Sequence, residues 1–280
     1  MSVRSSGFAQ GVIAACLVGM AMSVQAAEWP GGSSFTIPAG TSVTNATAQP
    51  SISCFTNNGT LTFLPGAEVT LTGSVITAIG SGMDASGVFE CLGGKLVHQG
   101  SGYFVVGHAG AVGSMTIAAG AEVRMPPGRF CIAHNGVAWR ERPARGDVSV
   151  AGLLSADIIE LTGYFPTNLA PPYVLSATLA LEEGGVVEAG LIGKHDCARS
   201  EIRFNGGTLR TLKDTTSLFT GQGIVDLVIA DNTGAVFDTN GKTAVITPGV
   251  SPGSVCLRGQ TNAAAIGNGG LVKKGEGMLA

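Results

Sequence analysis

Hydrophobic and polar residues alternate with a period of two in short runs along most of the chain, and Gly, Asn or Pro separates one run from the next. Clear examples are Ser34–Ile37, Thr60–Phe63, Glu68–Thr72, Met115–Ile117 and Asp147–Val150. Because successive side chains of a β-strand point to opposite faces, each run predicts a strand with one buried face. Helical periodicity is almost absent beyond residue 30, so the pattern predicts an all-β fold.

The runs themselves recur along the chain. Three segments share a pattern of strand, tight turn with Gly, and strand: Thr36–Thr44, Thr62–Thr70 and Thr116–Arg124. Their glycines Gly40, Gly66 and Gly120 are separated by 26 (66 − 40) and 54 (120 − 66) residues, close to one and two units of a 26–27-residue period. Weaker copies occur at Leu181–Val187 and Ile229–Phe237. Strands that repeat at this period without helices predict a β-solenoid of stacked rungs.

One short rung cannot bury its apolar face, whereas stacked rungs cover each other and share backbone hydrogen bonds. We therefore expect Val43, Val69 and Val123 to point into a shared interior, with the three repeat glycines at equivalent corners that need a positive φ. With about 20–25 residues in each rung, residues 27–280 would form roughly ten rungs, and a spacing of about 4.8 Å between rungs would give a rod about 50 Å long. An antiparallel β-sandwich explains the alternation equally well but not the phase of the glycines, so the solenoid is favoured.

The first residues have the order of a secretory signal peptide. Arg4 precedes an apolar run, Gly11–Met22, and Val24 and Ala26 then offer small side chains at the positions that a signal peptidase reads. We expect cleavage after Ala26, which divides the chain into a signal peptide (1–26) and an exported region (27–280). The apolar run is shorter than the roughly 20 residues that span a bilayer. Lipidation of Cys16 is a less favoured alternative, because the apolar stretch before it is very short.

Charge and composition exclude several classes of partner. Without residues 1–26, which contain one Arg and no acidic residue, 15 basic residues remain (16 − 1) against 19 acidic ones. This weakly acidic balance argues against a nucleic-acid partner and against a polybasic membrane tether, since both depend on clustered Lys and Arg. Glycine is frequent, at 43 of 280 residues, and the hydrophobic fraction of 45% is too high for a wholly disordered chain. The composition favours many short strands joined by glycine turns.

Five cysteines remain after cleavage, at widely spaced positions: Cys54, Cys91, Cys131, Cys197 and Cys256. A disulfide-stapled scaffold normally has an even number at close spacings. We expect most of these cysteines to be small buried hydrophobic residues in strands.

Two segments interrupt the strand pattern. Trp139–Arg145 concentrates charge, and Phe165–Tyr173 contains three prolines, which cannot donate hydrogen bonds to a strand ladder. Both predict loops that leave the stack. Such loops are where we expect a glycan or protein ligand to bind, if the chain binds one.

Enzymatic chemistry has weak support. Asp226, Asp231 and Asp238 form the densest acidic group, but their spacing does not place them on one face of a strand, and Asp238 lies in a good turn sequence. A zinc site could draw on two pairs, Cys131 with His134 and His195 with Cys197, but the pairs lie far apart in the sequence and neither has a known spacing. The sequence predicts no catalytic residue, metal or cofactor.

Three segments near the end resemble a known family. Ile202–Arg210 resembles the "FNGGTL" segment of bacterial proteins with autotransporter-associated β-strand repeats, Gly234–Gly241 resembles their "GGATIDTNG" segment, and Gly269–Leu279 is similar to their "GGLTKTGAGTLTLSG" segment. The match is good over residues 200–280, loose over residues 113–200 and only one of general style over residues 27–112. Lys274 and Glu276 depart from it, because small residues are usual there.

The resemblance implies a right-handed parallel β-helix of passenger type, exposed at the cell surface or secreted. It also implies a structural function, with an adhesive role as an extension of it, and suggests that the chain is the N-terminal part of a longer protein. The alternative is a β-helix polysaccharide lyase or glycoside hydrolase, which would need clustered carboxylates.

Overall fold

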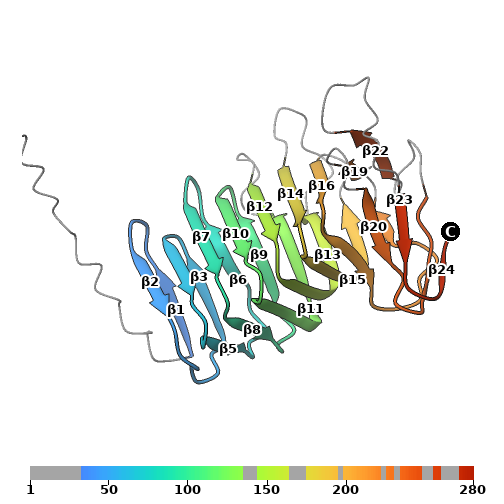
Figure 1. Ribbon diagram of the computed structural model, residues 1–280. Coiled ribbons are helices and arrows are strands. Elements are labelled where there is room, and N and C mark those ends of the chain that lie inside the picture. The colour runs from blue at the N-terminus through green and yellow to red at the C-terminus, as the bar shows by residue number, and fades with distance from the viewer. Residues whose placement is uncertain are drawn as a thin grey trace, which may run out of the picture.

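The computed structural model describes residues 33–134, 144–163, 175–194, 198–221, 225–229, 234–247, 255–259 and 271–280, with the backbone alone at 198–199 and 255–259. The described residues form an all-β solenoid of stacked parallel strands, as the sequence predicts (Figure 1). The predicted signal peptide lies outside them. No helix among these residues has the length and apolar character needed to cross a membrane.

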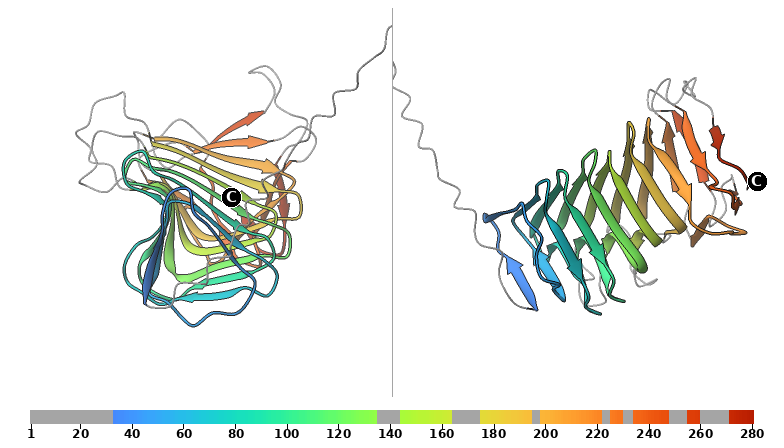
Figure 2. Two further views of the ribbon diagram at one scale, coloured as in Figure 1. Left: turned by 90° about the vertical axis from the view of Figure 1, so that its left-hand side faces the viewer. Right: turned by 60° about the horizontal axis from the view of Figure 1, so that its bottom comes forward.

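The strands stack as three faces that surround one interior, and the rungs superpose when viewed along the rod (Figure 2, left). Within the described residues, face 1 is a nine-stranded sheet. Its strands are β2 (Ser42–Asn45), β4 (Thr60–Phe63), β7 (Ser86–Cys91), β10 (Val112–Ile117), β12 (Arg145–Val150), β14 (Leu175–Glu182), β16 (Ala198–Asn205), β19 (Val225–Ile229) and β22 (Val255–Gly259).

Faces 2 and 3 belong to one sheet, thirteen-stranded over the described ranges, which long strands join across a bend. The long strands are β11 (Glu122–His134), β13 (Leu153–Gly163) and β15 (Val186–Lys194), and their first halves lie on face 2 and their second halves on face 3. Face 2 also contains β5 (Glu68–Leu71), β8 (Lys95–His98), β17 (Thr208–Thr211), β20 (Ala235–Asp238) and β23 (Leu271–Lys274). Face 3 also contains β1 (Ser34–Ile37), β3 (Cys54–Asn57), β6 (Thr77–Ser81), β9 (Tyr103–His108) and β18 (Phe219–Gly221). A short sheet pairs β21 (Thr243–Ala244) with β24 (Met278–Leu279).

Columns of inward side chains fill the interior. On face 3, Phe35 stacks on Phe55 with ring centroids 5.5 Å apart, and Phe104 stacks on Phe130 at 5.7 Å. Thr77 occupies the position between Phe55 and Phe104, and its small side chain lets these two rings meet edge to face at 6.1 Å. Each column therefore depends on matched sizes in successive rungs, as close packing requires.

The predicted interior valines are confirmed. Val43, Val69 and Val123 are each at most 3% exposed, and Val69 and Val123 share one column, separated by Leu96 of β8. Gly66 and Gly120 lie at equivalent corners between faces 1 and 2 and have φ values of 94° and 81°. These two corners are two rungs apart, which accounts for the doubled spacing of their glycines in the sequence.

The predicted equivalence of Gly40 was wrong. Thr36–Thr44 runs from face 3 to face 1, whereas Thr62–Thr70 and Thr116–Arg124 both run from face 1 to face 2. Gly40 has a φ of 75°, so it also makes a turn, but at a different corner. Every corner of a solenoid needs strand, turn and strand, and the hydrophobic pattern therefore cannot tell one corner from another.

A column of left-handed residues bends the chain out of face 3. Gly80, Gly107, Ala133 and Thr162 occupy successive rungs, with φ values of 71°, 79°, 58° and 72°. At Gly107 a Cβ atom would lie only 2.1 Å from the carbonyl oxygen of Arg145. The fold therefore needs glycine there for space as well as for φ.

Charges of opposite sign alternate along the outside of face 2. In register, the positions are Arg124, Ser155, Glu188, Arg210, Asp238 and Lys274. Arg210 links two rungs, with Nη1 3.1 Å from Glu188 Oε1 and Nε 2.8 Å from Asp238 Oδ2. Burial raises the pKa of the Asp238 carboxyl, but hydrogen bonds from Arg210 and from the Asn240 amide outweigh it, so the pKa lies below its ordinary value. The alternation favours this register of the rungs.

An interior histidine has no hydrogen-bond partner among the described residues. His98 of β8 is fully buried next to Leu71 of β5, and neither ring nitrogen has a partner there. Burial lowers the pKa of His98 below 6.5, so the ring is neutral at pH 7. A buried polar group without a partner destabilises the folded state.

Replacing Val69 with Asp should unfold the surrounding rungs, because it places an unpaired charge in the interior. We expect a loss of more than about 4 kcal/mol in the free energy of unfolding, measured by denaturant titration. Thr70→Asp is the matched control, since the next side chain points outward, and it should change stability by less than about 0.5 kcal/mol. Equal losses in both variants would contradict the assignment of the faces.

Replacing His98 with Leu should stabilise the fold by about 1–3 kcal/mol at pH 7. In the wild type, the unfolded chain takes up a proton on His98 near pH 6.5 and the folded chain takes it up only at a lower pH, so stability declines as the pH falls below 6.5. His98→Leu should show a shallower decline between pH 7 and 5 in urea titrations. His108→Gln, which alters a hydrogen-bonded ring instead, should lower stability at pH 7. A loss of stability in His98→Leu would show that the ring has an unseen partner.

Candidate functional site

The densest group of chemically versatile side chains lies on the outside of face 3. Tyr103, Arg129, Ile158 and Leu191 occupy one column of successive rungs. Val105, Cys131, Glu160, Gly193 and Thr220 occupy the neighbouring column. Side chains that are far apart in the sequence therefore become neighbours on one surface.

A continuous series of contacts crosses β6, β9 and β11. The Arg129 guanidinium lies 5.6 Å from the centre of the Tyr103 ring, and the Tyr103 ring packs edge to face on His134 at 6.0 Å. His134 contacts His108 with ring centroids 5.6 Å apart, and His108 Nδ1 forms a 3.0 Å hydrogen bond with Ser81 Oγ. Burial lowers the pKa of His108, so its ring is neutral at pH 7.

Two side chains on the outer side of face 3 are flanked by these contacts and have no exposed surface. They are Val105, which lies between Tyr103 and His108 on β9, and Cys131, which lies between Arg129 and His134 on β11. Tyr103 contacts both Arg129 and His134 of the next strand, and Cys131 lies between these two residues along β11, so we infer that the Tyr103 ring covers the thiol. The Cys131 thiol donates a 3.4 Å hydrogen bond to Glu160 Oε2, and burial, together with the Glu160 charge, raises the pKa of the thiol well above its ordinary value. Cys131 is therefore a protected thiol and not a nucleophile.

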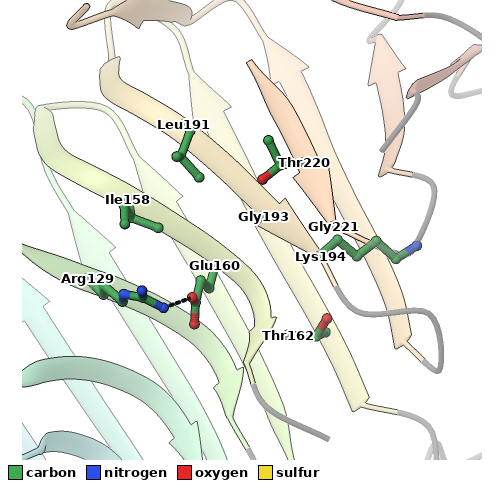
Figure 3. A pocket seen from close by; sticks show the side chains of 9 residues that line it. All are labelled: Arg129, Ile158, Glu160, Thr162, Leu191, Gly193, Lys194, Thr220 and Gly221. Carbon is green, nitrogen blue, oxygen red and sulfur yellow. Dashed lines mark hydrogen bonds and ion pairs between the residues drawn. The ribbon is translucent and has the colours of Figure 1, made fainter. Parts of the chain in front are cut away.

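Next to these contacts lies an open depression of about 350 Å³ (Figure 3). Its lining residues are Arg129, Ile158, Glu160, Thr162, Leu191, Gly193, Lys194, Thr220 and Gly221. Arg129 Nη1 lies 2.6 Å from Glu160 Oε1, and the Glu160 side chain is only 19% exposed. The aromatic contact on one side and the ion pair on the other fix the direction of the guanidinium. The depression thus combines an oriented cation, a carboxylate and an apolar side formed by Ile158 and Leu191.

The acidic group named by the sequence does not form a site. Asp226 lies on β19 of face 1 and Asp238 on β20 of face 2, while Asp231 lies outside the described residues. Asp226 instead pairs in register with Glu201 of β16, a neighbour that sequence spacing did not reveal. Arg203 binds Glu201 through its Nε at 2.7 Å, which offsets one of these charges.

The two halves of the considered zinc site are not brought together in the described part of the chain. His195 and Cys197 lie outside it. Cys131 and His134 are both on β11, where the thiol bonds to Glu160 and the ring packs between Tyr103 and His108. Over the described ranges, no group of three or more His, Cys, Asp or Glu side chains is arranged to hold a metal ion.

The predicted binding loops fall almost entirely outside the described residues. Phe165–Tyr173 and positions 139–143 are not described. The end of Trp139–Arg145 was wrongly assigned to a loop: Ala144 is fully buried, and Arg145 begins β12, where its Nε lies 2.7 Å from Asp147 Oδ2. Arg145 is in register with Val112 of β10, so the face 1 ladder has already resumed there.

The expectation for the cysteines is confirmed at two positions. Cys91 and Cys131 are buried free thiols, and Cys54 is a half-buried free thiol. Burial raises the pKa of Cys91 to about 11. Cys197 and the side chain of Cys256 lie outside the described residues.

Sequence reasoning missed Tyr103, Arg129 and Glu160 as a group. The steps along the chain between neighbours in the first column, from Tyr103 to Arg129, from Arg129 to Ile158 and from Ile158 to Leu191, become longer at each rung. No fixed period aligns them. The sequence did draw attention to this region through Cys131 and His134, the pair considered for zinc, which lies next to Tyr103, Arg129 and Glu160 in the structure.

No protein-family model matches this chain, and no curated protein or solved structure matches it either.

Replacing Tyr103 with Ala should uncover Cys131. We expect iodoacetamide to label Cys131 of the folded variant at least about tenfold faster than in the wild type, because protection of a buried thiol depends on its access to solvent. Peptide mass spectrometry measures each thiol separately. Cys91, which lies inside the solenoid, is the internal control and should keep its rate. An unchanged rate at Cys131 would show that another segment covers it.

Proposed function

We propose that this chain is an exported structural scaffold, a β-solenoid of autotransporter-passenger type, displayed at the cell surface or secreted. The observation that carries the proposal is the continuous register of face 1, in which the nine described parallel strands stack in chain order. Such a rod gains stability mainly from contacts between neighbouring rungs. Its regular outer faces hold side chains and loops at fixed intervals, which is what a display function needs.

The arrangement of side chains also favours a scaffold over an enzyme. On face 2, the carboxylates of Glu188 and Asp238 bind Arg210, and so link rungs. On face 3, Glu160 binds Arg129 and accepts a hydrogen bond from the Cys131 thiol. These carboxylates have structural partners that account for them. An adhesive role extends the scaffold proposal, with the outer surface of face 3 as the contact region.

The alternative is a polysaccharide lyase or glycoside hydrolase. One observation favours it: Glu201 and Asp226 stand side by side on neighbouring rungs of face 1. Glycoside cleavage uses two carboxyl groups held about 5–10 Å apart, with separated protonation behaviour. The two hydrogen bonds from Arg203 occupy both carboxylate oxygens of Glu201, which suits a structural role better than acid catalysis.

Expression of the full chain in a bacterium with a general secretory pathway tests the proposal. We expect an exported product that begins at Ala27 and shows no turnover of plant or bacterial polysaccharides, with or without calcium, when new reducing ends and unsaturated products are measured. A product that keeps Met1 in the cytoplasm, or carries lipid on Cys16, would contradict the export pathway. Turnover that is lost in Glu201→Gln, Asp226→Asn or Asp238→Asn would establish the enzyme instead.

A further inference from the structure

We propose that the depression on face 3 binds a saccharide unit that carries a carboxylate, such as a uronic acid. This proposal builds on the scaffold function by naming a ligand class for its outer surface. The depression has a volume of about 350 Å³, at the small end of the range for small-ligand sites, roughly 300–1,000 Å³. This size suits one sugar unit rather than a folded partner.

The lining matches both sides of a sugar ring. Ile158 and Leu191 are adjacent in register and only partly buried, so they offer an apolar surface to the C–H face of a pyranose. The polar edge of the ring would meet the guanidinium of Arg129, the carboxylate of Glu160 and the hydroxyl of Thr220. In Figure 3 these groups surround the central position of Gly193.

The orientation of Arg129 favours an acidic sugar over a neutral one. Of the three charged residues in the lining, Arg129 and Glu160 form an ion pair, and the Lys194 side chain extends away from them (Figure 3). Arg129 is already oriented by Glu160 at 2.6 Å and by the Tyr103 ring, so little side-chain entropy is lost when it binds an anion. Its planar fork has five N–H donors, and the ion pair with Glu160 uses Nη1. The remaining donors can bind a ligand carboxylate.

Gly193 is the strongest evidence that the depression is a specific feature of this surface and not a by-product of strand packing. A Cβ at this position would meet only Glu160 Cγ and Thr220 Oγ1, both at 3.8 Å, which is ordinary van der Waals contact. Its φ is not in the left-handed region, in contrast to Gly221 of the next rung with a φ of 109°. Neither space nor backbone conformation therefore requires glycine at 193, and glycine weakens a strand. Its effect is to keep the floor of the depression open.

The backbone argues against an extended peptide as the ligand. Peptides commonly bind sheets by adding a strand to a free edge. On face 3, β13 pairs with both β11 and β15, and β15 pairs with both β13 and β18. β13 and β15, which carry most of the lining residues, therefore offer no free edge to a peptide, and recognition over these two strands comes from side chains.

Calorimetric titration of the purified full chain tests the site with three probes: oligogalacturonate, a cello-oligosaccharide of equal length and tetraglutamate. We expect binding of the oligogalacturonate at least about tenfold tighter than that of the other two probes. Gly193→Val should weaken it by about tenfold or more while thermal stability stays equal or rises, because valine fills the floor and favours a strand.

Arg129→Lys should weaken binding of the oligogalacturonate by about tenfold, because lysine keeps the charge but loses the planar fork. Arg124→Lys, at an ion-paired arginine of similar exposure on face 2, is the matched control and should bind like the wild type. Equal binding of the neutral probe, preferred binding of the peptide, no binding of the oligogalacturonate, or full binding by Gly193→Val would each overturn the proposal. None of these results bears on where the chain is exported, so the scaffold proposal is tested separately.

Discussion

The parallel register between successive rungs is the constraint on which the rest of the structure depends. Once backbone hydrogen bonds fix one residue opposite another, every side chain is stacked on the residues one rung before and after it. Inside the solenoid, this makes size the variable that must match: Phe104 stacks on Phe130, and Thr77 leaves room for Phe55 to reach Phe104. His98 is an exception, because its column offers no hydrogen-bond partner in the described part of the chain.

Outside the solenoid, the same register makes charge the variable that must match. The alternation of Glu188, Arg210 and Asp238 on face 2 gives each ion a partner of opposite sign on the next rung. Exposed ion pairs contribute little one at a time, but a column of them penalises shifted registers. On face 3 the register produces a different result. It aligns Arg129, Glu160 and Gly193 around a depression instead of a continuous ladder, and the proposed ligand site is a consequence of this change.

Rung length explains why a regular structure comes from an irregular sequence. On face 1, the step along the chain from Ser42 to its partner Thr60 is little more than half of the step from Val112 to its partner Arg145. The strands keep their positions because the ladders fix them, and the turns and loops between strands absorb the differences. A search for one period therefore finds only those rungs that happen to be equal. The same variation separates the members of the Tyr103 column by unequal distances and hides their proximity.

The sequence by itself predicted the class of fold, because alternation of period two is a local property of each strand and recurring glycine turns favour stacked rungs. It also determined that Val43, Val69 and Val123 are interior, since a buried face must be apolar. Only the tertiary structure decided which corner each turn occupies, which of the acidic residues are neighbours, and that a cation, a carboxylate and an open glycine meet on face 3. These are relations between rungs, and they depend on the lengths of the intervening loops, which local hydrophobic pattern does not encode.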